Sequence, residues 1–170
     1  VADGHSSDST CEIAEKMGAE IILQNGSVGK GNGVRGALKE IFLAPVDEGD
    51  LLIMLDADAT YNPEDLPRFI SELEQNDVVW GSRLKGNREK KAMSTTNFIG
   101  NKILSFAASI IFLKRTTDLC TGYWGFRKTS LKSMELVASG FSLEADLFGT
   151  TAMSGMKTKE IPIDYSRREG

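Results

Sequence analysis

The 170-residue sequence contains one histidine, His5, and only two cysteines, Cys11 and Cys120, which lie far apart in the chain. A single histidine leaves little room for a metal site or a catalytic triad built on imidazoles. Two distant cysteines argue against a disulfide framework and favour a reducing compartment. We therefore expect a cytoplasmic protein.

Long hydrophobic segments are also lacking. The longest apolar run, residues 103–113, is too short to span a bilayer as a helix, which needs about 20 residues. The net charge of −4 argues against nucleic acid as a partner, while 41% hydrophobic and 26% charged residues are typical of an ordinary globular domain. We expect one domain over residues 1–170, and Val1-Ala2-Asp3 looks like the end of a strand. We therefore expect a fragment of a longer chain that lacks at least one N-terminal strand.

Apolar segments with the length of strands alternate with segments of helical pattern. Helices are expected at about residues 8–17, 32–43 and 94–113, and from residues 63 and 142. Strands are expected at residues 1–2, 19–24, 51–55, 77–82, 122–127 and 158–165. This alternation predicts an α/β fold with a mostly parallel sheet and helices on both faces. In such sheets ligands bind at the carboxyl ends of the strands.

Two carboxylates, Asp56 and Asp58, follow directly after the apolar run 51–55. In an extended chain, residues i and i+2 project to the same side, so both side chains can reach one cation. Oxygen ligands of this kind suit Mg²⁺ or Mn²⁺. The alternative is an ordinary turn in which Asp58 caps the approach to the helix at Pro63.

The stretch "DADAT", residues 56–60, also matches the phosphatase pattern DxDxT, in which Asp56 would be the nucleophile. That chemistry needs a further acidic pair at a later strand end, and no convincing one follows. A phosphatase is therefore the second hypothesis. A non-catalytic protein that binds nucleotide sugars is the third.

Several other residues are candidates for binding phosphate or a nucleotide. Asp3 lies at a predicted strand end, and Lys30 lies in the glycine-rich stretch "GSVGKGNG", which lacks the spacing of a Walker A loop. Arg83 and Arg127 also follow or end predicted strands, and guanidinium groups can hold phosphates with two hydrogen bonds. Each of these arginines is otherwise an ordinary surface charge.

Seven stretches together resemble the family 2 inverting glycosyltransferases, most closely the dolichol-phosphate (polyprenyl-phosphate) mannose or glucose synthase group. The stretches are "VADGHSSDST", "GKGNGVRGAL", "LIMLDADATYNPEDL", "VVWGSRLKG", "TDLCTGYWGFR", "GFSLEADL" and "IPIDYSRREG". The resemblance extends over essentially the whole chain. It implies a GT-A fold, a nucleotide-sugar donor of the GDP-mannose or UDP-glucose type, and a polyprenyl-phosphate or saccharide acceptor.

The resemblance also implies roles for individual residues. Asp3 would contact the base or ribose of the donor, and Lys30 would line the nucleotide pocket. Asp56 would lie near the ribose and diphosphate, and Asp58 would be the more direct ligand of Mg²⁺ or Mn²⁺. Some members of the family have a metal-binding Gln where this chain has Thr60, which leaves the third protein ligand open.

Three further residues gain a role from the resemblance. Arg168 matches an arginine of the last motif and would hold a phosphate. Glu144 and Asp146 would form an acidic motif on the acceptor side, although carboxylates are also favourable near the start of any helix. A sugar hydroxyl as acceptor would need one of them as a general base. A lipid phosphate is already anionic at neutral pH and would need no strong base.

The predicted helix at 94–113 is apolar nearly all round, which indicates either a buried helix or one that faces lipid. Basic residues precede, interrupt and follow it: Lys90, Lys91, Lys102, Lys114 and Arg115. This pattern favours a helix that lies at a membrane surface with anionic lipid, at the cytoplasmic face in the parent protein. A core helix packed on the sheet is the alternative.

Overall fold

The α/β architecture is confirmed. The computed structural model describes residues 1–25, 29–138 and 142–168. In chain order the elements are β1 (Ala2–Asp3), α1 (Thr10–Lys16), β2 (Ile22–Leu23), α2 (Lys30–Ile41), β3 (Leu51–Met54), the 3₁₀ turn η1 (Pro63–Asp65), α3 (Leu66–Leu73), β4 (Val78–Ser82), α4 (Thr95–Ile111), β5 (Trp124–Arg127), α5 (Lys128–Lys132), α6 (Leu143–Met153) and β6 (Thr158–Pro162). The helix expected from residue 63 begins with η1, capped by the Asn62 side chain, which accepts a hydrogen bond from the Glu64 N–H.

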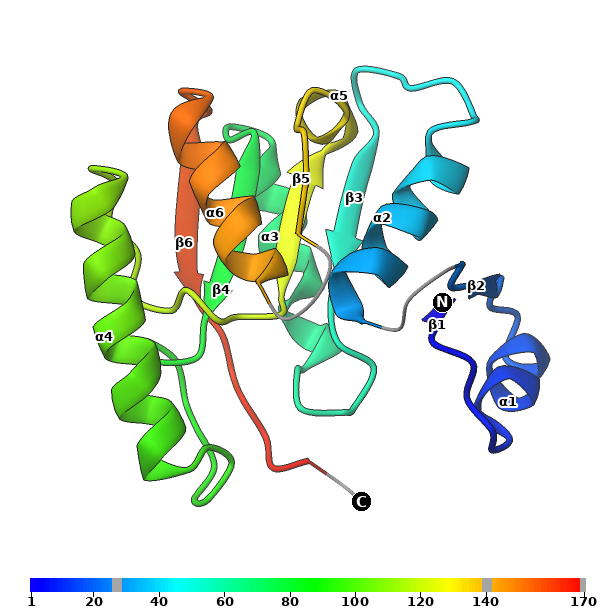
Figure 1. Ribbon diagram of the computed structural model, residues 1–170, viewed down its shortest axis with the longest axis horizontal. Coiled ribbons are helices and arrows are strands. Elements are labelled where there is room, and N and C mark those ends of the chain that lie inside the picture. The colour runs from blue at the N-terminus through cyan, green and yellow to red at the C-terminus, as the bar shows by residue number, and fades with distance from the viewer. Residues whose placement is uncertain (26–28, 139–141, 169–170) are drawn as a thin grey trace.

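The main sheet has the strand order β3-β5-β4-β6, and β1 and β2 form a separate parallel pair. Strands β3, β4 and β6 run in the same direction, whereas β5 runs against both of its neighbours, so the sheet is mixed. The chain enters β5 at the edge where β3 and β4 end, because Trp124 at the start of β5 lies opposite Met54 and Trp80. The segment before β5 therefore joins the carboxyl ends of β3 and β4 at one edge, the lower edge in Figure 1.

Alternation along β4 divides the core into two layers. Val78 and Trp80 face a cluster that includes residues of α4, α5 and α6, whereas Val79 faces a second cluster that includes Phe69 and Leu73 of α3. Both faces of the sheet are thus covered by helices, as expected (Figure 1). Burying these large side chains contributes roughly 1.5–3 kcal/mol each, which fixes the strand ends in place.

An apolar cavity of about 940 Å³ lies between the β1–β2 pair, α2 and β3. Among the described residues, β1 pairs only with β2, and β3 pairs only with β5, so each strand has one unpaired edge. The strand expected before residue 1 stays a prediction.

Candidate functional site

A pocket of about 490 Å³ opens at the strand-end edge that the sequence pattern indicated. It is lined by residues from five separate parts of the chain: Lys30, Asp56, Ala57, Asp58, Cys120, Glu144 and Arg168. Five of these seven are residues for which the sequence predicted a role. The fold therefore brings together groups that are more than a hundred residues apart in sequence.

Lys30 lies at the centre of the charged groups in this pocket. It is the first residue of α2, and its Nζ lies 2.6 Å from Asp56 Oδ1 and 2.6 Å from Glu144 Oε1. Glu144 comes from the first turn of α6, where a carboxylate is favourable. Burial opposes the charge of Lys30, but the two carboxylates outweigh burial and raise the pKa of Lys30 above its usual value. Lys30 is therefore positively charged at neutral pH.

Asp58 forms a tight turn and still presents one oxygen to the pocket. Its Oδ1 accepts hydrogen bonds from the Thr60 hydroxyl (2.6 Å) and the Thr60 N–H (3.3 Å), while Ala59 adopts a left-handed φ of 59°. Its Oδ2 lies 3.0 Å from Nη2 of Arg168. Partial burial opposes ionisation, but the Thr60 and Arg168 contacts lower the pKa of Asp58. The alternative in which Asp58 caps the helix at Pro63 is wrong, because Asn62 is the cap.

The wall behind Asp56 is Gly122, and only glycine fits there. A Cβ added at residue 122 would lie 2.3 Å from Asp56 Oδ2. The Gly122 N–H donates a 2.6 Å hydrogen bond to the buried Tyr61 hydroxyl, whose pKa is raised by burial. Asp56 is thus held between Lys30 on one side and the Gly122 backbone on the other.

The carboxylates of the pocket fit a hard divalent cation. Asp56 and Asp58 offer carboxylate oxygen atoms in one pocket. Their negative charges are balanced here by Lys30 and Arg168, with which they form ion pairs. Within the part of the chain that the structure describes, no group of three or more His, Cys, Asp or Glu could hold an ion alone. Such an ion would take its remaining ligands from phosphate oxygens or water, as Mg²⁺ commonly does in proteins.

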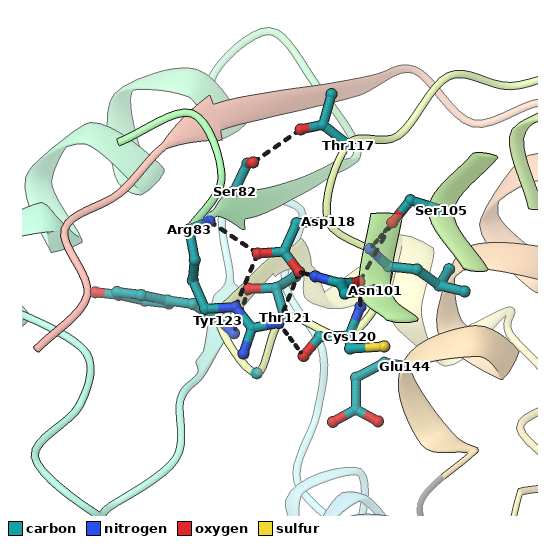
Figure 2. Close-up of polar contacts among 12 residues, drawn as sticks. Ser82, Arg83, Asn101, Ser105, Thr117, Asp118, Cys120, Thr121, Tyr123 and Glu144 are labelled. Carbon is teal, nitrogen blue, oxygen red and sulfur yellow. Dashed lines mark hydrogen bonds and ion pairs between the residues drawn. The ribbon is translucent and has the colours of Figure 1, made fainter. Parts of the chain in front are cut away.

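Arg83 lies beside the pocket but faces inward (Figure 2). Its guanidinium donates hydrogen bonds to both oxygens of Asp118, 2.7 Å and 2.8 Å long, and to the Cys120 carbonyl. The Arg83 side chain is only 10% exposed, and its guanidinium lies 5.1 Å from the ring centroid of Tyr165. The predicted role of Arg83 in binding phosphate stays a prediction, but its hydrogen bonds here serve the protein interior.

Three predicted site residues lie elsewhere. Arg127 pairs with Leu51 at the beginning of β3, at the opposite end of the sheet from the pocket, and donates to the Glu74 carbonyl. Asp146 accepts hydrogen bonds from the Val137 and Ala138 N–H groups and does not line the pocket.

Asp3 is buried at the end of β1, and two hydrogen bonds from Ser6 lower its pKa. The roles predicted for Arg127, Asp146 and Asp3 stay predictions, and their positions do not support a shared site for all of them.

Sequence reasoning missed Asp118, Asn101, Tyr61 and Cys120. Asp118 is fully buried, which is rare for a carboxylate, and only its cation and amide partners explain the burial. The signal in the sequence was the stretch "TDLCTGYWGFR", which contains Asp118 and Cys120 and to which the resemblance assigned no role for either residue.

Comparisons with known proteins give a consistent result. The sequence model described as Glycosyl transferase family 2 matches residues 1–134. The chain is 36% identical to the glycosyltransferase AglJ of Haloferax volcanii over 169 residues, which cover 99% of this chain and 54% of that protein. It is 34% identical to a dolichyl-phosphate hexose transferase of the same organism (97% of this chain, 68% of that protein). It is 29% identical to an undecaprenyl-phosphate mannosyltransferase of Micrococcus luteus (99% and 72%).

Among solved structures, glucosyl-3-phosphoglycerate synthase from Mycobacterium tuberculosis, in complex with Mn²⁺, UDP and phosphoglyceric acid, superposes with a TM-score of 0.72. The identity is 20%, and the match covers 100% of this chain and 59% of that chain. This likeness supports the GT-A fold. The first of the relatives named above is nearly twice as long as the part of it that this chain matches.

Proposed function

Because the chain belongs to glycosyl transferase family 2, we propose that its parent protein transfers a hexose from a nucleotide sugar to a polyprenyl phosphate, with a divalent cation as cofactor. The relatives named as dolichyl-phosphate and undecaprenyl-phosphate transferases support this acceptor class. Membership of this family displaces the phosphatase hypothesis.

The observation that supports the proposal most directly is the convergence of Asp56, Asp58, Lys30, Glu144 and Arg168 in one pocket at the strand-end edge. Three carboxylates and two cations in one pocket suit a ligand that combines a metal ion with a diphosphate. Neither kind of ligand alone would need both signs of charge.

Asp56 and Asp58 would hold the cation, which would stabilise the negative charge that develops on the diphosphate leaving group. Lys30 and Arg168 would exchange part of their present ion pairs for phosphate oxygens. Arg168 is well placed for this exchange because its side chain is 69% exposed and its partner, Asp58, lies in the pocket. A lipid phosphate would attack without a strong base, since it is anionic at neutral pH.

Glu144 would act as a general base only for a saccharide acceptor. Its carboxylate lines the pocket and lies 2.6 Å from Lys30 Nζ, and a carboxylate in reach of an acceptor hydroxyl can take up its proton. Transfer to a sugar hydroxyl is thus the second candidate function, and acceptor choice in the assay separates the two.

The test compares the full-length parent with its Asp58→Asn variant, which keeps the shape of the side chain and removes the charge. Transfer of labelled hexose from GDP-mannose and UDP-glucose to a polyprenyl phosphate is measured with and without Mn²⁺. We expect Asp58→Asn to lose at least about a hundredfold in kcat/KM while it remains folded. Asp77→Asn is the matched control, because Asp77 lies just before β4, at the opposite end of that strand from the pocket.

Full Mn²⁺-dependent transfer by Asp58→Asn would contradict the metal assignment. Binding of GDP or UDP by the wild-type protein without any transfer would favour the non-catalytic hypothesis instead.

We also propose that the outer face of α4 contacts a membrane surface. Its large apolar residues are each more than half exposed: Ile99, Ile103, Leu104, Phe106, Ile110 and Ile111, followed by Leu113. The opposite face is buried through Asn101, Ser105 and Ala108, so α4 packs on the fold along that face, and the contact of its outer face with a membrane stays a proposal. Among the described residues, no helix is long and apolar enough to cross a membrane.

The charges around α4 favour an anionic bilayer as the partner. Lys102 and Arg88 both stack on the ring of Phe98, and Arg115 follows the helix. Basic groups beside an exposed apolar stripe are attracted to anionic lipid at about 1 kcal/mol each. An acceptor drawn from the bilayer would then meet the helix whose buried side bonds to Cys120 of the pocket lining through Asn101. The cytoplasmic face of the membrane stays a prediction.

Co-sedimentation with phosphatidylglycerol-containing vesicles tests this contact. Phe106→Ser with Ile110→Ser should abolish binding, and Lys102→Glu with Arg115→Glu should weaken it in a salt-dependent manner. Ile70→Ser on α3, also an exposed apolar residue, is the matched control. Binding by the wild type that neither pair of substitutions alters would contradict the proposed surface.

A further inference from the structure

The segment from Thr116 to Gly122 forms one wall of the pocket and is held almost entirely by side chains. It follows α4 and precedes β5 without regular secondary structure of its own. Cys120 in this segment lines the pocket, and Gly122 contacts Asp56. The position of this pocket wall therefore depends on the contacts that fix its irregular backbone.

The centre of the arrangement is the carboxylate of Asp118, which is fully buried (Figure 2). Its Oδ2 accepts hydrogen bonds from the Arg83 N–H and Nε–H, each 2.8 Å long. Its Oδ1 accepts from Arg83 Nη2 at 2.7 Å and from Asn101 Nδ2 at 2.6 Å. Four donors converge on one carboxylate and fix its orientation.

The same partners also hold the backbone on either side of Cys120. Asn101 Oδ1 accepts from the Cys120 N–H at 3.2 Å, and Arg83 Nη2 donates to the Cys120 carbonyl at 2.7 Å. Ser105, one turn after Asn101 on α4, accepts the Leu119 N–H at 2.8 Å. Helix α4 and the end of β4 thus hold residues 118–120 through both backbone donors and acceptors.

We infer that Asp118, Arg83 and Asn101 are positioning residues for the transfer reaction, because they hold the Cys120–Gly122 wall against Asp56. This inference rests on the proposed function. A buried ion pair adds little net stability compared with apolar residues of the same size. What the pair supplies here is a defined backbone path at a point where Gly122 leaves no free space beside Asp56.

The network has a second consequence for α4. Asn101 and Ser105 lie on the buried face of the same helix whose outer face exposes Ile103 and Phe106. The helix proposed to contact the membrane is therefore hydrogen-bonded directly to the pocket wall. Asn101 and Ser105 therefore fix both the position of α4 on the protein and the backbone that lies against Asp56.

Amide hydrogen exchange in the 170-residue chain tests the positioning role without any assay of activity. The relevant amides are those of Leu119, Cys120 and Gly122, whose acceptors are Ser105, Asn101 and Tyr61. In Asp118→Asn these three amides should exchange at least about tenfold faster, while the Val79 amide in β4 remains protected. Asp77→Asn should leave all three unchanged, because its carboxylate holds Ser130 and Lys157 at the far end of β4.

Kinetics of the full-length parent supply the second readout. Asp118→Asn should lower kcat at least about tenfold. Asp77→Asn should keep the wild-type kcat even if its melting temperature falls as far as that of Asp118→Asn. If Asp118→Asn does not fold, Asn101→Ser takes its place, since it removes the links to Asp118 and Cys120 and keeps the Arg83–Asp118 pair.

Unchanged exchange at residues 119, 120 and 122, or a wild-type kcat in both Asp118→Asn and Asn101→Ser, would overturn the positioning role. A wild-type parent that binds no nucleotide sugar and transfers no sugar would instead refute the proposed function, and the exchange result would still decide whether the network holds the wall.

Discussion

Replacing Gly122 by alanine should distort the pocket, because the added methyl group would clash with Asp56. The added Cβ would lie 2.3 Å from Oδ2 and 2.7 Å from Cγ of Asp56, whereas an ordinary contact needs about 3.4 Å or more. One of the two groups must therefore move by about 1 Å. The Gly122 N–H is tied to Tyr61, so Asp56 is the group that moves.

Movement of Asp56 would stretch its 2.6 Å contact with Lys30 and displace a carboxylate assigned to the metal. A displacement of about 1 Å can cost roughly a hundredfold in rate, and overpacking typically costs about 1–3 kcal/mol of stability. We expect kcat/KM of the parent enzyme to fall about a hundredfold and the free energy of unfolding, measured in urea, to fall by about 1–3 kcal/mol.

Gly36→Ala is the matched control, because a Cβ at Gly36 in α2 meets nothing within 4 Å. In a helix interior that change should stabilise the chain by roughly 0.5–1 kcal/mol and leave transfer intact. Wild-type kcat/KM in Gly122→Ala would refute the reasoning that Asp56 must lie directly against residue 122.

Three further predictions concern single side chains. Lys30→Met leaves Asp56 and Glu144 without their shared cation, so the affinity for GDP or UDP should fall at least about tenfold by isothermal titration, with the fold retained in circular dichroism. Ala59→Gly relieves a left-handed φ of 59° and should raise the free energy of unfolding in urea by up to about 1 kcal/mol; a loss of stability would contradict the strain. Burial of Glu160 opposes its ionisation, but Lys85 and the Thr117 N–H lower its pKa below the unfolded value, so the stability that it contributes is present above about pH 4.5 and is lost as the pH falls through its folded pKa. Glu160→Gln should flatten the fall of the free energy of unfolding between about pH 5 and 3, and an unchanged slope would rule Glu160 out as its source.

The sequence by itself determined the local features of this protein. The spacing of apolar segments predicted the alternating strands and helices, because periodicity depends on neighbours along the chain. The i, i+2 spacing placed Asp56 and Asp58 together after β3, and the strand-end rule placed them at an edge where ligands bind.

The tertiary structure decided which other side chains reach that edge. Lys30 and Glu144 are in contact although they are 114 positions apart in the sequence. No local sequence pattern extends over that separation, so none could predict the contact. Arg83 and Arg127 looked alike in the sequence, yet β5 runs against its neighbours, so Arg127 lies at the opposite end of the sheet. Arg83 turns inward because a carboxylate, Asp118, is buried beside it. Direction of a strand and burial of a charge depend on long-range packing, which the order of residues alone does not reveal.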